Sequence, residues 1–180
     1  NIAVTSYKPL GIDKIKMRVD IPGQKPTMHL TQNIDDARQT IGNIIRNYTR
    51  QGIQKKQIVI LTVKTEETSL LSGVSSVAGY TLAQSRDSNG IMFTSSRKFK
   101  GLESDVVIIV DVDDSCFLDD EKRRVFYVGS SRAKHFLDIV SVMDDQHVNN
   151  MVVQLTGEEK KNARLALASF LKVKLVSGSV

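Results

Sequence analysis

The chain has 180 residues, of which 41% are hydrophobic and 25% charged, which fits one globular α/β domain or one domain with an attached arm. Its net charge of +5 is compatible with a polyanionic partner and equally with none. The single cysteine, Cys116, excludes an intrachain disulfide, and the scattered histidines His29, His135 and His147 form no metal-ligand motif, so we expect a reducing, cytoplasmic setting and no bound metal.

Residues 1–26 are predicted to form a basic N-terminal arm. Five cations outnumber two acids in this segment, and the polar–apolar alternation from Lys14 to Ile21 predicts an edge strand. The chain starts at Asn1 and shows neither a signal peptide nor an apolar run near the roughly 18 residues that span a membrane. We therefore expect a piece of a longer protein, without a membrane partner, in which residues 27–180 form the folded domain.

Short strands and helices alternate over the next part of the chain. Apolar residues keep helical spacing from Ile34 to Tyr48, with Asn33 or Asp35 as the N-cap and Gly52 at the end. A continuous apolar run, as in 58–61, is typical of a strand buried on both faces. Further strands are predicted over 28–30 and 80–82, and a short helix over 66–71 that ends near Gly73.

The second half of the chain continues this alternation. Strands are predicted over 91–94, 106–110 and 136–142, with 106–110 at the centre of the sheet, and helices over 121–133 and 158–173, the latter opened by Thr156 or Gly157. The acidic run 111–120 lacks the spacing of a calcium loop and predicts a surface insertion. Strands separated by helices indicate an α/β fold with a mostly parallel sheet covered on both faces.

A cationic turn precedes the predicted central strand. It reads Lys100-Gly101-Leu102-Glu103, in which the glycine lets the backbone approach a ligand closely. Lys100 suits a phosphate or a carboxylate, and Glu103 can accept hydrogen bonds from a ribose hydroxyl. A charged turn that only caps the strand is the alternative for these four residues.

An arginine lies near the end of the predicted helix 121–133. Val125, Val128 and Arg132 fall at i, i+3 and i+7, which places all three on the face expected to pack on the sheet. An inward arginine is costly unless an anion meets it, and a phosphate suits the guanidinium well. An ion pair with a structural acid such as Asp111 is the alternative.

Together the two segments resemble motifs V and VI of the UvrD/Rep-type superfamily 1 DNA helicases. Motif V typically reads Thr-x-His-x-x-Lys-Gly-Leu-Glu before an apolar strand, and Ser95 and Arg97 take the places of its Thr and His. Motif VI ends a helix with Tyr-Val-Ala-x-Thr-Arg-Ala, and Gly129, Ser131 and Arg132 take its Ala, second Thr and Arg positions. The hydroxyls are kept, and arginine in place of histidine keeps a hydrogen-bond donor.

The resemblance implies a three-layer, RecA-like fold of the P-loop NTPase type, here as the second motor domain of a helicase. This domain closes over ATP and Mg²⁺ that a preceding motor domain of the full-length parent holds. By the resemblance, Arg132 is the catalytic residue that meets the γ-phosphate, and Lys100, Gly101 and Glu103 lie at the nucleotide. Ser95 and Arg97 are implied to contact single-stranded or partly duplex DNA.

Two features separate the chain from a complete motor. No Gly-x-x-x-x-Gly-Lys-Ser/Thr sequence occurs in it, so the phosphate loop is absent and the chain alone is not expected to hydrolyse ATP. The family usually carries an arginine after the strand that matches 58–61, whereas this chain has Lys64 one step away. Lys64 is therefore a weaker candidate for ATP binding, since lysine lacks the bidentate guanidinium, and a solvated residue is the alternative.

Three hypotheses follow. The first is the C-terminal motor domain of an ATP-dependent DNA helicase. The second is a degenerate helicase-like module that binds nucleic acid or a protein partner without motor activity. The third is an unrelated α/β enzyme, which no paired carboxylates, nucleophile elbow or Cys/His pair supports.

Overall fold

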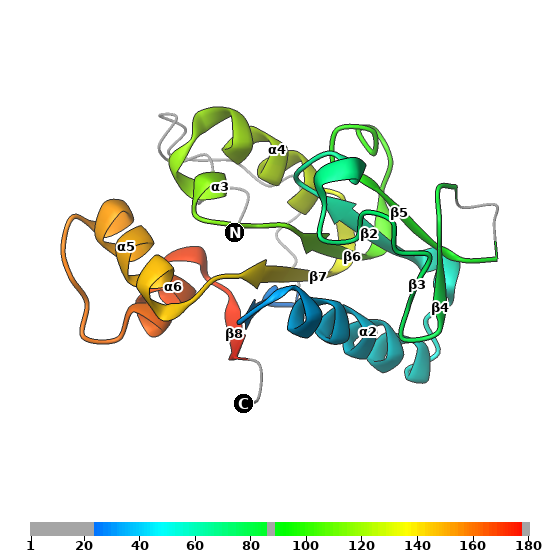
Figure 1. Cartoon of the computed structure of the whole chain (residues 1–180), viewed down its shortest axis with the longest axis horizontal. Helices are drawn as coiled ribbons and strands as arrows, with labels where there is room; N and C mark the ends of the chain where they lie inside the picture. Colours follow the sequence, from blue (N-terminus) through cyan, green and yellow to red (C-terminus); the bar gives the residue numbers. More distant parts are fainter. Residues whose placement is uncertain (1–23, 86–88, 178–180) are drawn as a thin grey trace.

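Eight strands form one sheet in the order β3-β4-β5-β2-β6-β7-β1-β8 (Figure 1). The computed structural model describes residues 24–85 and 89–177, so the predicted strand 14–21 and most of the predicted arm 1–26 lie outside the described residues. All neighbouring strands pair in parallel except β3 and β4, which are antiparallel. The strands are β1 Thr27–Thr31, β2 Ile58–Thr62, β3 Ser76–Val77, β4 Tyr80–Ala83, β5 Ile91–Ser95, β6 Ser104–Val110, β7 Ala133–Val142 and β8 Lys174–Ser177.

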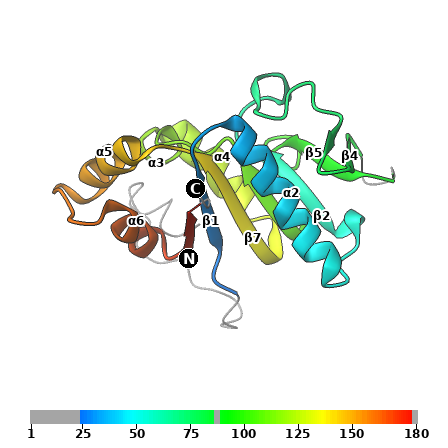
Figure 2. The same ribbon diagram turned by 60° about the horizontal axis from the view of Figure 1, so that its bottom comes forward.

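Helices cover both faces of this sheet. One face carries α2 (Ile34–Arg50), which Figure 2 shows lying alongside β7, and the other carries α3 (Ser115–Leu118), α4 (Asp120–Ser130), α5 (Asp145–Thr156) and α6 (Ala163–Leu171). Two separate apolar cores fill the two spaces between sheet and helices. The predicted three-layer α/β fold with a mostly parallel sheet is therefore confirmed.

The central strands are buried because they are apolar at consecutive positions. All five residues of β2 are buried, and so are six of the seven residues of β6. Alternate residues of one strand serve opposite cores: Val59 and Leu61 face α4, whereas Ile58 and Ile60 face α2. The prediction of a strand over 106–110 at the centre of the sheet is confirmed.

Helix α2 begins as the sequence indicates. The side chain of Asn33 accepts a hydrogen bond from the Asp36 N–H at 2.9 Å, so Asn33 is the N-cap. Gly52, with a φ of +90°, follows the helix in the left-handed conformation that favours glycine. The helix then docks closely on the β3–β4 turn, where a Cβ on Gly42 would meet the Cβ of Ala78 at 2.5 Å.

The C-terminal region differs from the prediction of one helix over 158–173. The structure has two helices, α5 and α6, followed by β8, which pairs in parallel with β1. Gly157 has a φ of +80° and caps the C-terminus of α5, so it ends one helix instead of opening the next. The N-cap of α6 is Asn162, whose side chain accepts from the Leu165 N–H at 3.0 Å.

The acidic run 111–120 is not a surface insertion as predicted. Val112, Cys116 and Phe117 are buried in the α4-side core, and Asp111 is 8% exposed. Two acids of this run cap short helices: Asp114 caps α3 and Asp119 caps α4.

The predicted short helix over 66–71 is a single 3₁₀ turn, η3, over Glu66–Thr68. Among the described helices, none combines the length and apolar character needed to cross a membrane.

Candidate functional site: two edges of the sheet joined by one crossover

Residues 96–103 connect two opposite sides of the sheet without a helix. We call the side where the parallel strands begin, as at Ser104, the amino edge, and the side where they end, as at Ser95, the carboxyl edge. β5 ends at Ser95, level with the carboxyl end of β2, whereas β6 begins at Ser104, at the amino end of the sheet. Phe99 anchors the crossover because its side chain is fully buried in the α4-side core. Its backbone closes turns in both directions, with Phe99 N–H donating to Ser95 O and Leu102 N–H donating to Phe99 O, each at 3.1 Å.

The two motif-like segments meet at the amino edge. The Ser104 N–H donates to the carbonyl of Arg132 at 3.0 Å, and Ser104 pairs with Ala133 in the sheet. This pairing places the segment Lys100–Glu103 beside Arg132, as the resemblance predicts. Gly101 has a φ of +88°, and no atom lies within 4 Å of an added Cβ, so its backbone conformation, not crowding, favours glycine here.

Arg132 lies in the turn between α4 and β7, just beyond the helix end at Ser130. Its Nε donates to the carbonyl of Val128 at 3.1 Å, and its Nη2 donates to the hydroxyl of Ser131 at 2.9 Å. Among the described residues no carboxylate pairs with Arg132, which leaves part of its guanidinium for an anion. The alternative partner, Asp111, accepts its hydrogen bonds elsewhere.

The predicted inward face of this helix is wrong by about one residue. Val125 is buried as predicted, but Val128 is only partly buried. The other buried residues of the helix are Arg123, Phe126, Gly129 and Ser130. The fully buried Phe126 ring, packed edge-on against Phe117, sets this rotation. Arg123 is therefore the inward arginine of α4, and it is neutralised locally through Asp120 and the carbonyl of Phe117.

A close contact joins the crossover to α4. A Cβ on Gly129 would meet the Ser96 Oγ at 2.6 Å and the Ile109 Cδ1 at 3.3 Å, so only glycine fits without a shift. Ser96 is fully buried, and its hydroxyl has no hydrogen-bond partner within the described residues. Its N–H donates to the carbonyl of Thr62 at 2.8 Å, which ties the same residue to β2. The backbone of α4 at Gly129 thus packs directly against the side chain of Ser96 in the crossover.

The carboxyl edge carries three exposed cations, each paired with an acid. Arg97 Nη2 lies 2.5 Å from Glu121 Oε1, Lys98 Nζ lies 3.1 Å from Glu66 Oε1, and Lys64 Nζ lies 4.0 Å from Asp113 Oδ2. Such exposed pairs contribute little to stability, about 0–1 kcal/mol each, and a competing anion can displace the acid.

Two of the residues predicted for this site have different surroundings from the rest. Ser95 is 8% exposed, and its hydroxyl accepts from the Lys98 N–H at 3.3 Å, so in the structure it closes a turn. Lys64 lies at the carboxyl edge, about 20 Å from the amino edge if β6 rises about 3.3 Å per residue. The structure therefore does not bring Lys64 together with Arg132, and the contacts predicted for Ser95 with DNA and for Lys64 with ATP stay predictions.

Asp111 organises the carboxyl edge, a role that the sequence analysis missed. It follows β6 with a φ of +64°, a left-handed conformation that aspartate tolerates better than most residues. Its Oδ2 accepts from Thr62 Oγ1 at 2.6 Å and from Ser69 Oγ at 2.5 Å, and its Oδ1 accepts from the Leu70 N–H at 2.8 Å. The loop after η3 is thereby held to the ends of β2 and β6. A lone aspartate after a buried strand was the only signal in the sequence.

Glu66 gives this edge a pH-dependent contribution to stability. Burial alone would raise its pKa, but hydrogen bonds from Thr94, Lys98 and the Ser95 N–H outweigh burial and lower the pKa below its ordinary value of 4.5. A carboxyl with a lowered pKa stabilises the fold fully above pH 4.5, and this stabilisation is lost as the pH falls through the folded-state pKa.

We expect Glu66→Gln to be less stable than the unchanged chain at pH 7 and the difference to shrink below pH 4.5. Urea unfolding of both proteins between pH 7 and pH 3 measures it. Glu159→Gln, at an exposed glutamate between α5 and α6, is the matched control and should show no such trend. A difference that stays constant with pH would contradict the assignment.

Within the described ranges, no group of three His, Cys, Asp or Glu side chains is placed to hold a metal ion. The donor set at the amino edge instead suits a polyphosphate. A half-buried guanidinium without an acid partner, an exposed lysine at Lys100 and a glycine turn that leaves the backbone open are what phosphate oxygens require.

Comparisons with known proteins show two similarities. Residues 90–140 match a protein-family model described as the UvrD-like helicase C-terminal domain. The matched segment contains the crossover, α4 and Arg132. No curated protein matches the chain. Among solved structures, the chain is similar to the C-terminal domain of a possible DNA helicase from Lactobacillus plantarum WCFS1, with 23% identity and a TM-score of 0.55 over 79% of this chain and 84% of that chain.

The chain has an α/β fold of the RecA-like type. Residues 90–140 are, more particularly, similar to UvrD-like helicase C-terminal domains, which confirms the resemblance predicted from the two motifs. The match covers less than half of the chain, and the similarity to the solved structure shows the fold alone.

Proposed function

We propose that this chain is the C-terminal motor domain of an ATP-dependent DNA helicase. The observation that carries the proposal is the hydrogen bond from Ser104 N–H to the carbonyl of Arg132, which holds the two motif-like segments side by side at the amino edge. A preceding motor domain of the same parent would supply the phosphate loop and close against this edge. We expect the parent to act in the cytoplasm, where it would meet DNA.

Each residue of the amino edge would contact a different part of the nucleotide. Arg132 would stabilise the charge on the γ-phosphate, since its guanidinium has no acid partner among the described residues. Lys100 and the open turn at Gly101 would meet the remaining phosphates or the sugar, and Glu103 would accept from a ribose hydroxyl. When bound, ATP with Mg²⁺ supplies the phosphoanhydride bond whose hydrolysis drives movement along DNA.

The carboxyl edge would bind the DNA backbone. Arg97 and Lys98 have side chains that are 65% and 67% exposed, and both follow directly from β5. A phosphate would replace Glu121 as the partner of Arg97, at little cost because the ion pair is exposed. The crossover then runs from the DNA at one edge to ATP at the other, and so couples the two.

The single-strand affinity of this chain tests the DNA half of the proposal. We expect Arg97→Ala to weaken binding of a fluorescent oligothymidylate and to reduce the slope of log affinity against log salt by about 0.7, the value of one phosphate contact. Lys161→Ala removes the same charge from an exposed position between α5 and α6 and should leave the slope unchanged. Equal effects of the two variants would show a non-specific charge effect and contradict the assignment.

One observation favours the second candidate, a helicase-like binding module without motor activity. The cations of the carboxyl edge are already neutralised by Glu121, Glu66 and Asp113, and the chain has no phosphate loop. DNA-stimulated ATP hydrolysis by the full-length parent separates the two functions, because a binding module would show none.

A further inference from the structure

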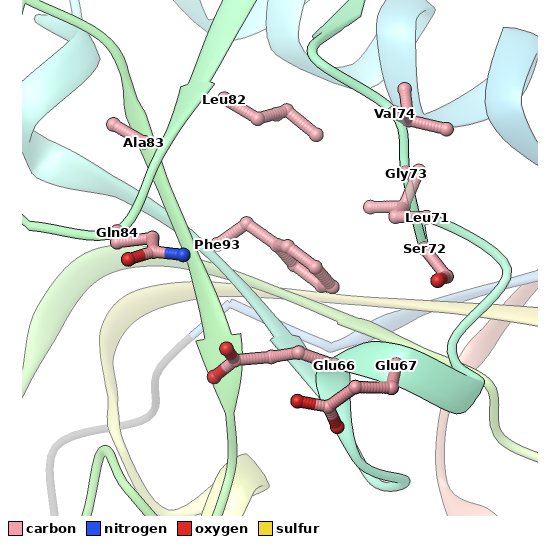
Figure 3. A pocket seen from close by; sticks show the side chains of 10 residues that line it. All are labelled: Glu66, Glu67, Leu71, Ser72, Gly73, Val74, Leu82, Ala83, Gln84 and Phe93. Atoms are coloured by element: carbon pink, nitrogen blue, oxygen red, sulfur yellow. The ribbon is translucent and has the colours of Figure 1, made fainter.

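A pocket of about 300 Å³ lies on the α2 side of the sheet, away from the amino edge (Figure 3). Strands β4 and β5 form one wall and the loop after η3 forms the other. In Figure 3 the side chains of Leu82 and Phe93 project from the strands toward the loop that carries Leu71 and Val74. Glu66 and Glu67 stand at the η3 end of the pocket. The pocket thus has apolar side chains on both walls, the polar side chains of Ser72 and Gln84 among them, and two carboxylates at one end.

The loop wall is held in place before any ligand binds. Asp111 accepts hydrogen bonds from Ser69 Oγ and the Leu70 N–H, and Arg38 Nε of α2 donates to the carbonyl of Leu70 at 2.9 Å. Leu71 is buried at the next position, which anchors the start of the wall in the α2-side core. A wall fixed from both the sheet and α2 lowers the entropy cost of binding, as in most preformed ligand sites.

The acidic end carries net negative charge at neutral pH. Hydrogen bonds from its own N–H and from Thr65 lower the pKa of Glu67, and the pKa of Glu66 is lowered as described above. Lys98 pairs with Glu66 Oε1, as do Thr94 and Ser95, so the polar contacts of Glu66 converge on one oxygen. Two carboxylates against one lysine repel a phosphate backbone and attract a cation.

The strand wall is held in place as well. β3 pairs with Thr81 and Tyr80 of β4, and the Leu82 N–H donates to the carbonyl of Ser75 at 2.9 Å. On the other side of β4, Ala83, which lines the pocket, pairs with Met92 of β5. Both walls are therefore fixed, and the cavity between them is the space that a side chain of a ligand can enter.

We propose that this pocket binds a segment of a protein partner in which an apolar residue stands next to a lysine or arginine. The apolar side chain occupies the space between Leu82, Phe93 and Val74, and the cation pairs with Glu67. The proposal does not rest on the helicase function, because the pocket shares no residue with the amino edge and adjoins the carboxyl edge only through the ion pair of Glu66 with Lys98.

The test follows backbone amide signals of the full ¹⁵N-labelled chain by NMR. The probes are the peptide acetyl-Ser-Leu-Arg-Leu-Arg-Ser-amide, the same peptide with glutamate in place of arginine, and an oligothymidylate. We expect the arginine peptide to shift the amides of Glu67, Val74, Leu82 and Phe93 in a saturable manner, and the glutamate peptide to leave them unchanged.

Variants that reverse one charge, at the acidic end of the pocket or far from it, provide a matched pair. Glu67→Lys should weaken the arginine peptide about five- to tenfold, the effect of turning an exposed attraction into a repulsion, whereas Glu159→Lys should not change it. Glu67 is exposed and lies outside the core, so the variant is expected to fold. Equal binding of both peptides, peptide shifts outside the pocket, or pocket shifts caused by the oligothymidylate alone would each overturn the proposal.

Discussion

Replacing Arg132 with alanine in the full-length parent is expected to lower the rate of DNA-stimulated ATP hydrolysis by on the order of 10³-fold. The guanidinium lies at the amino edge without an acid partner among the described residues, so its charge is available to the phosphoryl group. Arg132→Lys should recover only a small part of the loss, because lysine keeps the charge but not the planar pair of donors. Steady-state hydrolysis at saturating DNA measures both variants.

Arg124→Ala is the matched control for this experiment. Arg124 belongs to the same helix, but its side chain is exposed and away from the amino edge, so the variant should keep near-normal hydrolysis. If Arg132→Ala also keeps near-normal hydrolysis, Arg132 does not meet the γ-phosphate and the motor assignment fails. Unfolding curves of this chain with each substitution show whether any loss comes from instability.

Gly129→Ala is expected to destabilise the chain by about 1–3 kcal/mol, the cost of overpacking a filled core. The new Cβ would lie 2.6 Å from the Ser96 Oγ, closer than real side chains approach. The direction of this change in the free energy of unfolding is informative, because replacing glycine with alanine inside a helix normally stabilises a protein by about 0.5–1 kcal/mol. Urea unfolding of the chain gives the change in free energy.

Ser96→Ala provides the internal control. Alone it should be neutral or stabilising, since the buried hydroxyl that it removes has no partner in the described part of the chain. Combined with Gly129→Ala it should recover much of the loss, because the Ser96 Cβ would then be 3.3 Å from the new methyl group. A double-mutant cycle with no coupling energy would show that the two residues do not press on each other.

The parts of the fold that were predictable are those in which a single pattern decides the structure. The apolar runs in β2 and β6 are buried on both faces, and Asn33 caps α2 through the predicted side-chain contact. The C-terminal region was not predictable in the same way. Its helices are short, and Gly157 favours either a helix start or a helix end until its positive φ is known.

The order of the site segments in the sequence was predictable, but the side of the sheet on which each residue lies was not. Lys100–Glu103 and Arg132 lie side by side because both precede neighbouring parallel strands, whereas their roles at a nucleotide stay predictions. Lys64 was grouped with them although it follows a strand, which puts it at the opposite edge. The rotation of α4 was missed because an arginine at position 123 fits a helix surface equally well until the packing of Phe126 is known.

The crossover 96–103 is short for the distance that it spans. Nine peptide steps from Ser95 to Ser104 reach at most about 30 Å when extended, and the segment must descend about 20 Å, pass beneath β2 and still form the turns around Phe99. A short, hydrogen-bonded segment passes a displacement from one end to the other more directly than a long loop does. A movement of Arg97 toward a phosphate would therefore pull on Phe99 and on the glycine turn beyond it, which makes the number of residues in this link as important as their identity.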